Sequence, residues 1–180
     1  MPHHGVAVTV HYCTAAPDLG VAKSNDAGGA TPLGASWTWR LDVANTGSAA
    51  AAFLAGQTIL TDTLPAGPVY GAPTVGSVVN VTNPGNVACG IVANVLTCTA
   101  SAATVTLGAT TGAFRVSVVV TPAATGTFTN GAAACSVDPA GAVAELDEND
   151  NACNADGVTV TAPDLTVFKS HDVASPIPPG

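Results

Sequence analysis

Residues 36–43, with the sequence SWTWRLDV, alternate between apolar and polar side chains, and this alternation limits the fold more than any other feature of the chain. A period of two residues predicts a β-strand with one buried face, because successive side chains of a strand point to opposite sides of the sheet. Trp37 and Trp39 lie on the apolar face together with Leu41 and Val43. We therefore expect both tryptophans to pack in a core rather than to form an exposed platform for sugars.

More strand-like runs follow at intervals of about a dozen residues, separated by turns rich in Gly, Pro and Asn. They include the segments QTILTDT, ATVTLG, AFRVSVVVTP, GTFTNG and DGVTVT. No segment shows the apolar period of an amphipathic helix. The sequence thus predicts an all-β protein, an immunoglobulin-like β-sandwich with strand-forming N- and C-terminal extensions.

The chain is acidic, with 12 Asp and Glu against four Lys and Arg among 180 residues. This balance argues against binding to nucleic acids or to anionic membranes, both of which require clustered basic residues. No window approaches the roughly 20 consecutive apolar residues of a membrane-spanning helix. The first residues lack the features of a signal peptide, so we expect a leader that was removed or that lies on a longer precursor. Five cysteines favour an oxidising, extracellular compartment; a cytosolic protein with unpaired thiols is the alternative.

Several segments together resemble a known family. In order along the chain they are PDLGVAKS, TWRLDVANTG, LTDTLPAG and ATVTLGATTGAFRVSVVVTPAATGTFTNGAA, followed by an acidic, Asn-rich stretch and GVTVT. On these segments residues 18–160 resemble the conserved repeat domain eleven of unknown function, which occurs in tandem in bacterial and archaeal surface proteins. The resemblance implies a sandwich of about seven strands, an extracellular setting, and a role as spacer, adhesin stalk or wall component without catalysis.

The start of this family pattern occurs twice, as PDLGVAKS from Pro17 and as PDLTVFKS from Pro163. Such repeats follow directly on one another, so the chain divides into three parts. We expect residues 1–16 to be an N-terminal strand extension, residues 17–161 to be the complete sandwich, and residues 162–180 to be a C-terminal strand extension or the start of a next repeat.

The C-terminal extension carries an apolar row of Leu165, Val167 and Phe168. An unpaired strand leaves its backbone N–H and C=O groups without partners, so this segment is expected to add to the sheet of a neighbour. We predict a structural subunit of an extracellular filament, sheath or surface layer, a homopolymer that assembles head to tail by β-strand donation. The alternative is a spacer or adhesin domain of a tandem-repeat surface protein that binds a carbohydrate or a host protein.

The cysteines suggest two local disulfides. Cys89 and Cys98 flank a hairpin-sized segment, and Cys135 and Cys153 flank the acidic stretch. Each bond would contribute about 2–4 kcal/mol to stability. Cys13 is then left over, either as a free thiol or as an intermolecular link beside the N-terminal extension.

The acidic stretch ELDENDNACNADG offers oxygen ligands for calcium at Asp147, Asn149, Asn151 and Asp156. The pattern departs from an EF-hand loop, because Ala152 stands where the turn glycine belongs, and a solvated turn is the alternative. We expect no other cofactor. All four histidines lie in the terminal extensions and no G-x-S-x-G motif occurs, so we expect no enzyme activity.

The sequence also suggests two covalent modifications, an isopeptide bond and a glycosylated asparagine. In related sandwiches of pilus and adhesin proteins, a buried lysine attacks an asparagine amide beside a carboxylate and forms an isopeptide bond. Lys23 and Asn130 could react in this way with Asp42, or with Asp62, as the carboxylate; the alternative is a lysine that stays at the surface. The sequence Asn-Val-Thr at Asn80 fits the acceptor pattern for glycosylation.

Overall fold

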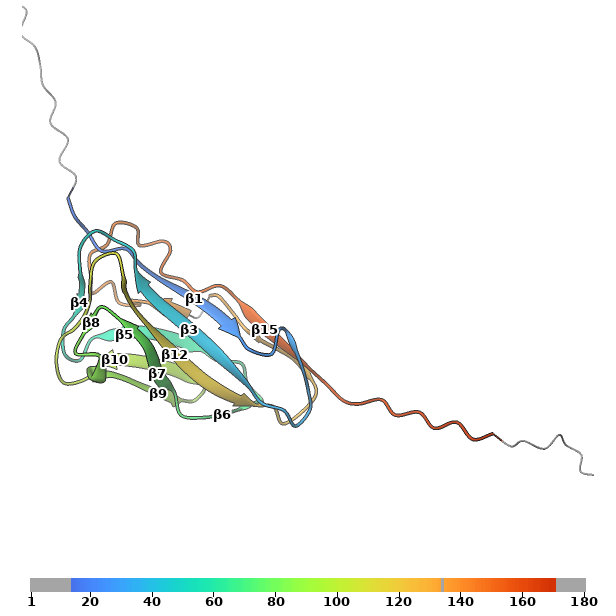
Figure 1. Cartoon of the computed structure of the whole chain (residues 1–180). Coiled ribbons are helices and arrows are strands. Elements are labelled where there is room, and N and C mark those ends of the chain that lie inside the picture. The colour runs from blue at the N-terminus through green and yellow to red at the C-terminus, as the bar shows by residue number, and fades with distance from the viewer. Residues whose placement is uncertain (1–13, 134, 171–180) are drawn as a thin grey trace, which may run out of the picture.

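The computed structural model describes residues 14–133 and 135–170, which form a body of β-strands with an extended segment at each end (Figure 1). Within this part of the chain there are fifteen strands and one short 3₁₀ helix, η1 (Pro84–Asn86). The strands build two main sheets and two smaller ones, and their buried side chains form one hydrophobic core. The predicted immunoglobulin-like β-sandwich is confirmed.

The first main sheet is antiparallel throughout. In spatial order it contains β1 (Leu19–Asn25), β3 (Trp37–Asn45) and β12 (Gly112–Thr121), with β6 (Val69–Tyr70) and β7 (Thr74–Val79) on the far side of β12. In this register Leu41 of β3 lies opposite both Lys23 of β1 and Val116 of β12. The pairing of β1 with β3 therefore puts Lys23 on the same face of the sheet as Leu41.

The second main sheet is also antiparallel, and its order is β14 (Cys135–Val137), β5 (Thr58–Thr63), β10 (Val95–Ala100) and β9 (Val87–Val92). The strand β5 contains a bulge, because Leu60 pairs with Cys98 whereas Thr58 pairs with the next residue, Thr99. Ile59 is thus an extra residue, and both Ile59 and Leu60 are buried. A bulge of this kind shifts the side-chain alternation of the strand by one position.

Two three-stranded sheets complete the body. One contains β4 (Ala51–Phe53), β11 (Val105–Leu107) and β8 (Val81–Thr82), and the other contains β13 (Gly126–Asn130), β15 (Asp156–Thr161) and β2 (Ala30–Pro32). The last strand β15 is antiparallel to β13 and parallel to β2. Asn130 ends β13 opposite Asp156, the first residue of β15.

The alternation of apolar and polar residues in β3 buries the predicted face of the strand. Trp37 and Trp39 are 2% and 0% exposed, and Leu41 and Val43 are fully buried beside them. The two indole rings meet edge to face with their centroids 5.5 Å apart, an arrangement worth about 0.5–1.5 kcal/mol beyond the area that it buries. Both tryptophans are therefore core residues, as expected from the sequence.

The segment that leads into β1 is held by a buried asparagine at the end of β3. The side-chain oxygen of Asn45 accepts hydrogen bonds from the backbone N–H groups of Asp18 and Gly47, both at 3.1 Å. A Cβ atom on Gly47 would lie 2.4 Å from the backbone nitrogen of Asp18. The segment before β1 can therefore pass this close to residue 47 only because glycine has no side chain. Asn45 and Gly47 thus fix where the chain enters the sandwich.

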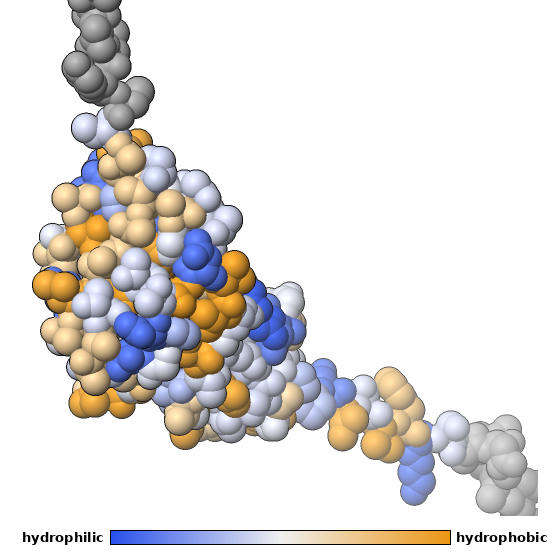
Figure 2. All heavy atoms as spheres, turned by 60° about the vertical axis from the view of Figure 1, so that its left-hand side comes forward, coloured by the Kyte–Doolittle hydropathy of each residue, from blue (hydrophilic) through white to orange (hydrophobic). Residues whose placement is uncertain are grey.

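The described segments before β1 and after β15 leave the body at opposite ends (Figure 1). Of the predicted N-terminal strand extension, only residues 14–16 are described, and they form no strand. Residues 162–170 form no strand within this single chain either. Figure 2 shows this segment projecting from the body with apolar side chains on its surface. Among the described residues, there is no helix with the length and apolar character that a membrane crossing requires.

Candidate functional site

Lys23 is a buried residue of the first strand, only 4% exposed. It follows Leu19 and Val21 at intervals of two residues, and all three point into the core while Ala22 and Ser24 are exposed. The alternative of a lysine that stays at the surface is therefore wrong. The strand register places its side chain on the inner face, where its ammonium cannot reach water.

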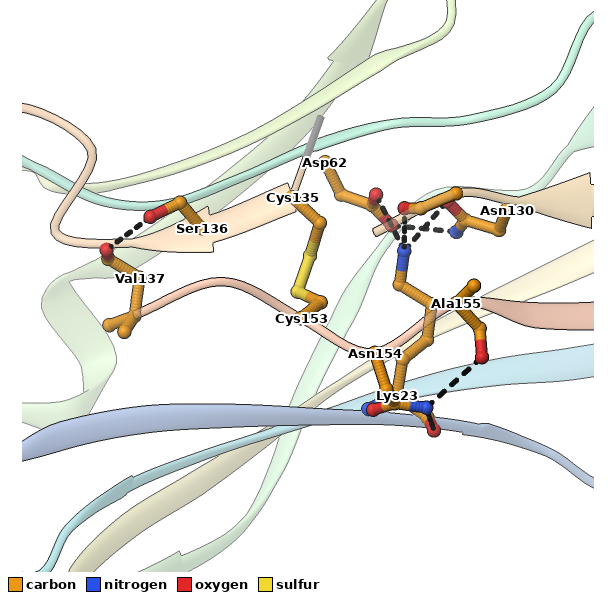
Figure 3. Close-up of a disulfide and its surroundings, with 10 residues drawn as sticks. Lys23, Asp62, Asn130, Cys135, Ser136, Val137, Cys153, Asn154 and Ala155 are labelled. Carbon is orange, nitrogen blue, oxygen red and sulfur yellow. Dashed lines mark hydrogen bonds and ion pairs between the residues drawn. A yellow bond between two sulfur atoms is a disulfide. The ribbon is translucent and has the colours of Figure 1, made fainter. Parts of the chain in front are cut away.

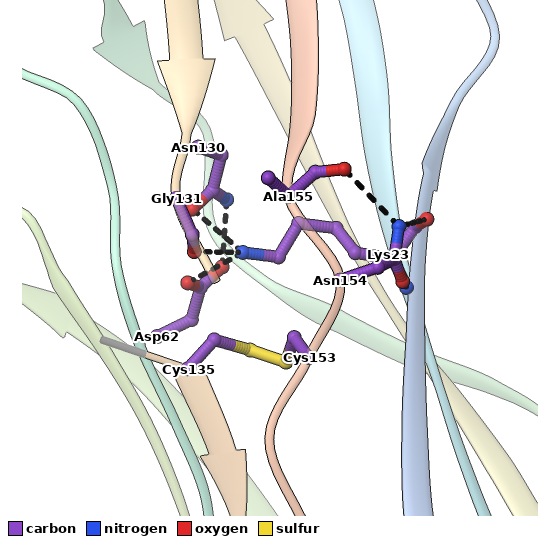
Figure 4. Close-up of polar contacts among 8 residues, drawn as sticks. All are labelled: Lys23, Asp62, Asn130, Gly131, Cys135, Cys153, Asn154 and Ala155. Atoms are coloured by element: carbon purple, nitrogen blue, oxygen red, sulfur yellow. Dashed lines mark hydrogen bonds and ion pairs between the residues drawn. A yellow bond between two sulfur atoms is a disulfide. The ribbon is translucent and has the colours of Figure 1, made fainter. Parts of the chain in front are cut away.

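Two polar side chains from other sheets meet the end of Lys23. Its Nζ atom donates hydrogen bonds to Oδ1 of Asp62 at 2.9 Å and to Oδ1 of Asn130 at 2.7 Å. Asn130 in turn donates from Nδ2 to Oδ2 of Asp62 at 2.7 Å. Figure 4 shows how these three residues, here called the buried triad, point toward one another from β1, β5 and β13. The backbone carbonyl of Gly131 accepts a further, longer hydrogen bond from Nζ at 3.2 Å.

The structure brings Asp62, and not Asp42, to the lysine. Asp42 lies on the outer face of β3, where its two carboxylate oxygens accept hydrogen bonds from Arg115 of the adjacent strand β12 at 2.7 and 3.0 Å. This outer position follows from the alternation of β3, since residue 42 is out of phase with the buried odd positions. Naming Asp42 as the carboxylate of the group was therefore wrong, and Asp62 is the aspartate of the buried triad.

Burial dominates the ionisation of the triad. Removal from water disfavours a charge, so it lowers the pKa of Lys23 and raises the pKa of Asp62. The hydrogen bond and the charge attraction between the two side chains act in the opposite direction and are weaker. The two pKa values therefore move toward each other, and the proton passes from the ammonium to the carboxylate more readily than it would in water.

The surroundings of the triad are held by a disulfide and by an asparagine. Cys135 lies opposite Asp62 in the β14–β5 register and is bonded to Cys153 (Figure 3). On the outer edge of β1, Asn154 accepts a hydrogen bond from the backbone N–H of Lys23 at 2.7 Å and donates one to its carbonyl at 2.8 Å. Asn154 thus covers the edge of β1 at the position of Lys23 and fixes the lysine backbone.

The structure contains both predicted disulfides, Cys135–Cys153 and Cys89–Cys98. Cys89 and Cys98 lie directly opposite each other on β9 and β10. Cys13, which the sequence leaves over, lies outside the described residues.

The four predicted calcium ligands make hydrogen bonds in three different places, and only Asp147 and Asn149 contact each other. Asp147 accepts hydrogen bonds from the backbone and side chain of Asn149 at 2.9 and 2.8 Å, an ordinary local turn. Asn151 donates to Glu145 at 3.2 Å, and Asp156 binds Asn25 through both oxygens at 2.8 Å. No group of three or more His, Cys, Asp or Glu suited to a metal ion occurs in the part of the chain that the structure describes. Calcium binding stays a prediction from the sequence.

The remaining predicted residues are at the surface. Asn80 is exposed between β7 and β8, and its side-chain amide donates to Thr111 at 3.0 Å. Leu165, Val167 and Phe168 of the C-terminal segment are 88%, 91% and 92% exposed. The residues named for glycosylation and for strand donation are therefore accessible, and both stay predictions from the sequence.

Comparison with known proteins adds information on the fold. No family model matches this sequence, and no curated protein is similar to it. The CARDB domain of the PF1109 protein from Pyrococcus furiosus, a crystal structure in complex with di-metal ions, superposes with a TM-score of 0.50. At 17% identity, the superposition covers 84% of this chain and 100% of that chain.

Two further solved structures are less similar. The solution structure of the same CARDB domain has a TM-score of 0.47 and 17% identity, and covers 82% of this chain and 97% of that one. The seventh ScaB type I cohesin from Pseudobacteroides cellulosolvens has a TM-score of 0.41 and 12% identity, and covers 85% of this chain and 98% of that one. At such identities a structural likeness concerns the fold alone, and the crystal structure of the CARDB domain supports the β-sandwich assigned above.

Proposed function

We propose that this protein is a structural module of an extracellular filament, sheath or surface layer, and that copies of it join head to tail by β-strand donation. The observation that carries the proposal is the apolar C-terminal segment, whose Leu165, Val167 and Phe168 are almost fully exposed. Disulfides are typical of proteins outside the cytosol, and two are present here.

The exposed segment repeats the sequence of a strand that is buried in the same molecule. Leu165 and Val167 correspond to Leu19 and Val21 of β1, which are 0% and 8% exposed. The same residue types are therefore buried in a strand at the first copy and exposed to solvent at the second copy. Burial of a Leu, Val or Phe side chain contributes about 1.5–3 kcal/mol, so adding this segment to a neighbouring sheet is favourable.

The opposite positions of the two described end segments support an arrangement in series. A segment that leaves one end of the body reaches a neighbour placed beyond that end. Head-to-tail contacts of this kind give an open filament unless the rotation between copies closes a ring.

A second candidate function is a spacer in a chain of tandem repeats, as the resemblance to repeat domain eleven implies. One observation favours it: Lys169 follows Leu165 and Val167 at the spacing with which Lys23 follows Leu19 and Val21. In this alternative the segment is the first strand of a following domain, and Lys169 becomes the buried lysine of that domain. An adhesin that grips a carbohydrate or a host protein belongs to the same alternative.

The oligomeric state distinguishes the two candidates. The 180-residue protein is studied at rising concentration by analytical ultracentrifugation and negative-stain electron microscopy, beside the double variant Leu165→Asp/Val167→Asp. Donation predicts filaments or a ladder of oligomers that the double variant loses. The control Leu54→Asp changes a side chain that is 59% exposed on the body and should keep the assemblies. A wild-type protein that stays monomeric at all concentrations contradicts donation and supports the tandem spacer.

A further inference from the structure

The buried triad combines an amine, an amide carbonyl and a carboxylate in a site without solvent access. The side chains of Lys23 and Asp62 are 0% exposed, and Asn130 is 0% exposed. Burying an ion pair contributes little or nothing to stability compared with apolar residues of the same size. Stability alone therefore does not explain why these three polar residues are buried together, and we consider a chemical reaction between them.

We propose that Lys23 and Asn130 become joined by an intramolecular isopeptide bond, and that Asp62 transfers the protons of this reaction. The inference concerns the inside of one chain, so it does not depend on strand donation.

The geometry meets the requirements of the reaction. A hydrogen bond of 2.7 Å from Nζ to Oδ1 of Asn130 places the amine beside the amide carbon that it would attack. One carboxylate oxygen of Asp62 contacts the attacking nitrogen at 2.9 Å, and the other contacts the leaving nitrogen, Nδ2, at 2.7 Å. Groups held in such an orientation react as if at very high concentration, because no further ordering is needed. Asp62 thus bridges the two nitrogens between which a proton must move.

The protonation states also suit the reaction. An amine attacks a carbonyl only in its neutral form, and burial favours this form of Lys23 by lowering its pKa. Burial likewise raises the pKa of Asp62, so that its carboxyl accepts the proton that the lysine gives up. A protonated carboxyl beside the amide can then donate to it as a general acid.

The proposed step balances in atoms and charge. Lys23 first passes one proton to Asp62, and the neutral Nζ forms a bond to Cγ of Asn130. The attacking nitrogen loses a second proton, the leaving nitrogen gains one through Asp62, and the bond between Cγ and Nδ2 breaks. Ammonia departs and takes the proton that Asp62 still holds, so an ammonium ion is released and Asp62 returns to its starting form. No oxidant, reductant or metal is consumed.

One competing reaction has the same mass change. Asn130 precedes Gly131, and an Asn-Gly sequence can lose ammonia by attack of the following backbone nitrogen, which yields a succinimide. A succinimide leaves Lys23 free, whereas the isopeptide joins Lys23 to Asn130. The experiment must therefore locate the bond as well as measure the mass.

Intact mass and a tryptic digest of the full 180-residue protein test the proposal. Its mass should be lower by that of one ammonia, about 17 Da, than the mass calculated with the disulfides formed. After reduction, trypsin should fail to cleave after Lys23 and should release a branched peptide that joins residues 1–40 to residues 116–169. Full mass, or peptides 1–23 and 24–40 in separate form, would overturn the inference; so would the mass loss without the branched peptide.

Variants assign the roles within the triad. Asp62→Asn keeps the shape of the side chain but removes the proton acceptor, so the protein should show its full mass and an unlinked Lys23. The matched control Asp42→Asn changes an aspartate on the outer face and should stay linked. In Asn130→Asp a carboxyl replaces the amide, and any bond formed there releases water instead of ammonia. Efficient linkage in a folded Asp62→Asn protein would refute the role of Asp62, and if that variant does not fold, the wild-type digest still decides the bond.

Discussion

Replacing Lys23 by Met should make the stability of this fold decrease as the pH rises from acidic to neutral. The substitution removes the only cation of the buried triad and leaves Asp62 with one donor, the amide of Asn130 at 2.7 Å. Burial already raises the pKa of Asp62 in the presence of Lys23, and the loss of the cation raises it further. At neutral pH the variant must either bury an uncompensated carboxylate or bind a proton that the unfolded chain does not hold.

The sign follows from the direction of this pKa shift. A carboxyl whose pKa is higher in the folded state stabilises the fold fully below its unfolded pKa of about 3.9. This stability is lost as the pH rises toward the folded pKa, at up to about 1.4 kcal/mol per pH unit. Relative to a protein in which Lys23 is not linked to Asn130, breaking the buried ion pair costs about 3–5 kcal/mol in all, a large part of the stability of a domain of this size.

The isopeptide bond would add a separate contribution that does not depend on pH in this way. Lys23 and Asn130 are 107 residues apart, and a cross-link that closes such a loop stabilises by about 5 kcal/mol in the chain-entropy description. The difference in unfolding free energy between wild type and variant at acidic pH therefore measures the effect of closing the loop. The change of the variant's unfolding free energy with pH measures the effect of the buried carboxyl.

Urea denaturation at a series of pH values between about 4 and 7 measures both quantities. The double variant Lys23→Met/Asp62→Asn is the matched control, because it carries neither charge and should lose the slope. A Lys23→Met protein whose unfolding free energy is flat across this range would refute the assignment of Asp62 as a buried carboxyl of raised pKa.

Replacing Cys135 and Cys153 together by Ala should lower the unfolding free energy by about 3 kcal/mol in urea denaturation, because the bond closes a loop of 18 residues. Leu41→Ala should lower it by about 2–5 kcal/mol in the same assay, since the side chain is fully buried in the core and belongs to the central strand β3. Gly47→Ala should lower the melting temperature measured by circular dichroism, because its Cβ would lie 2.4 Å from backbone atoms. Arg115→Ala should leave that temperature unchanged, since its ion pair is exposed.

The fold could be predicted from the sequence because its central strands carry a clear alternation. The odd positions of β3 are buried and its even positions face outward, so one pattern fixes both the strand and the face that it buries. The same reasoning extends to β1, where Leu19 and Val21 define the inner face and place Lys23 on it. Lysine is usually exposed, so the general preference of this residue type and the strand pattern give opposite predictions for Lys23.

Alternation places Asp42 on the outer face of β3, but it could not predict that Asp62 points into the core. Counting by twos from Ile59 places residue 61 inside and Asp62 outside. The bulge in β5 buries Ile59 and Leu60 in succession and turns Asp62 inward instead. A bulge depends on how β5 pairs with β10, and the sequence of β5 alone carries no sign of it.

The C-terminal segment shows a second limit of local sequence. Leu165 and Val167 stand in nearly the same motif as Leu19 and Val21, yet only the first copy forms a strand within this chain. The first copy pairs with β3, whereas residues 163–170 pair with no strand of the part of the chain that the structure describes. Whether such a motif becomes a strand is decided by its partner as much as by its residues.

The path of the chain through the buried triad has a consequence for how the module would respond to tension. A force applied to the two ends enters at β1 and leaves after β15, which is paired along its length with β13. A covalent connection from Lys23 to Asn130 would carry that force directly from β1 to β13. The 107-residue segment between them could then not be extended by force. The chain would be shorter at full extension by about 360 Å than a chain without the bond. Such a module would act as a nearly inextensible link.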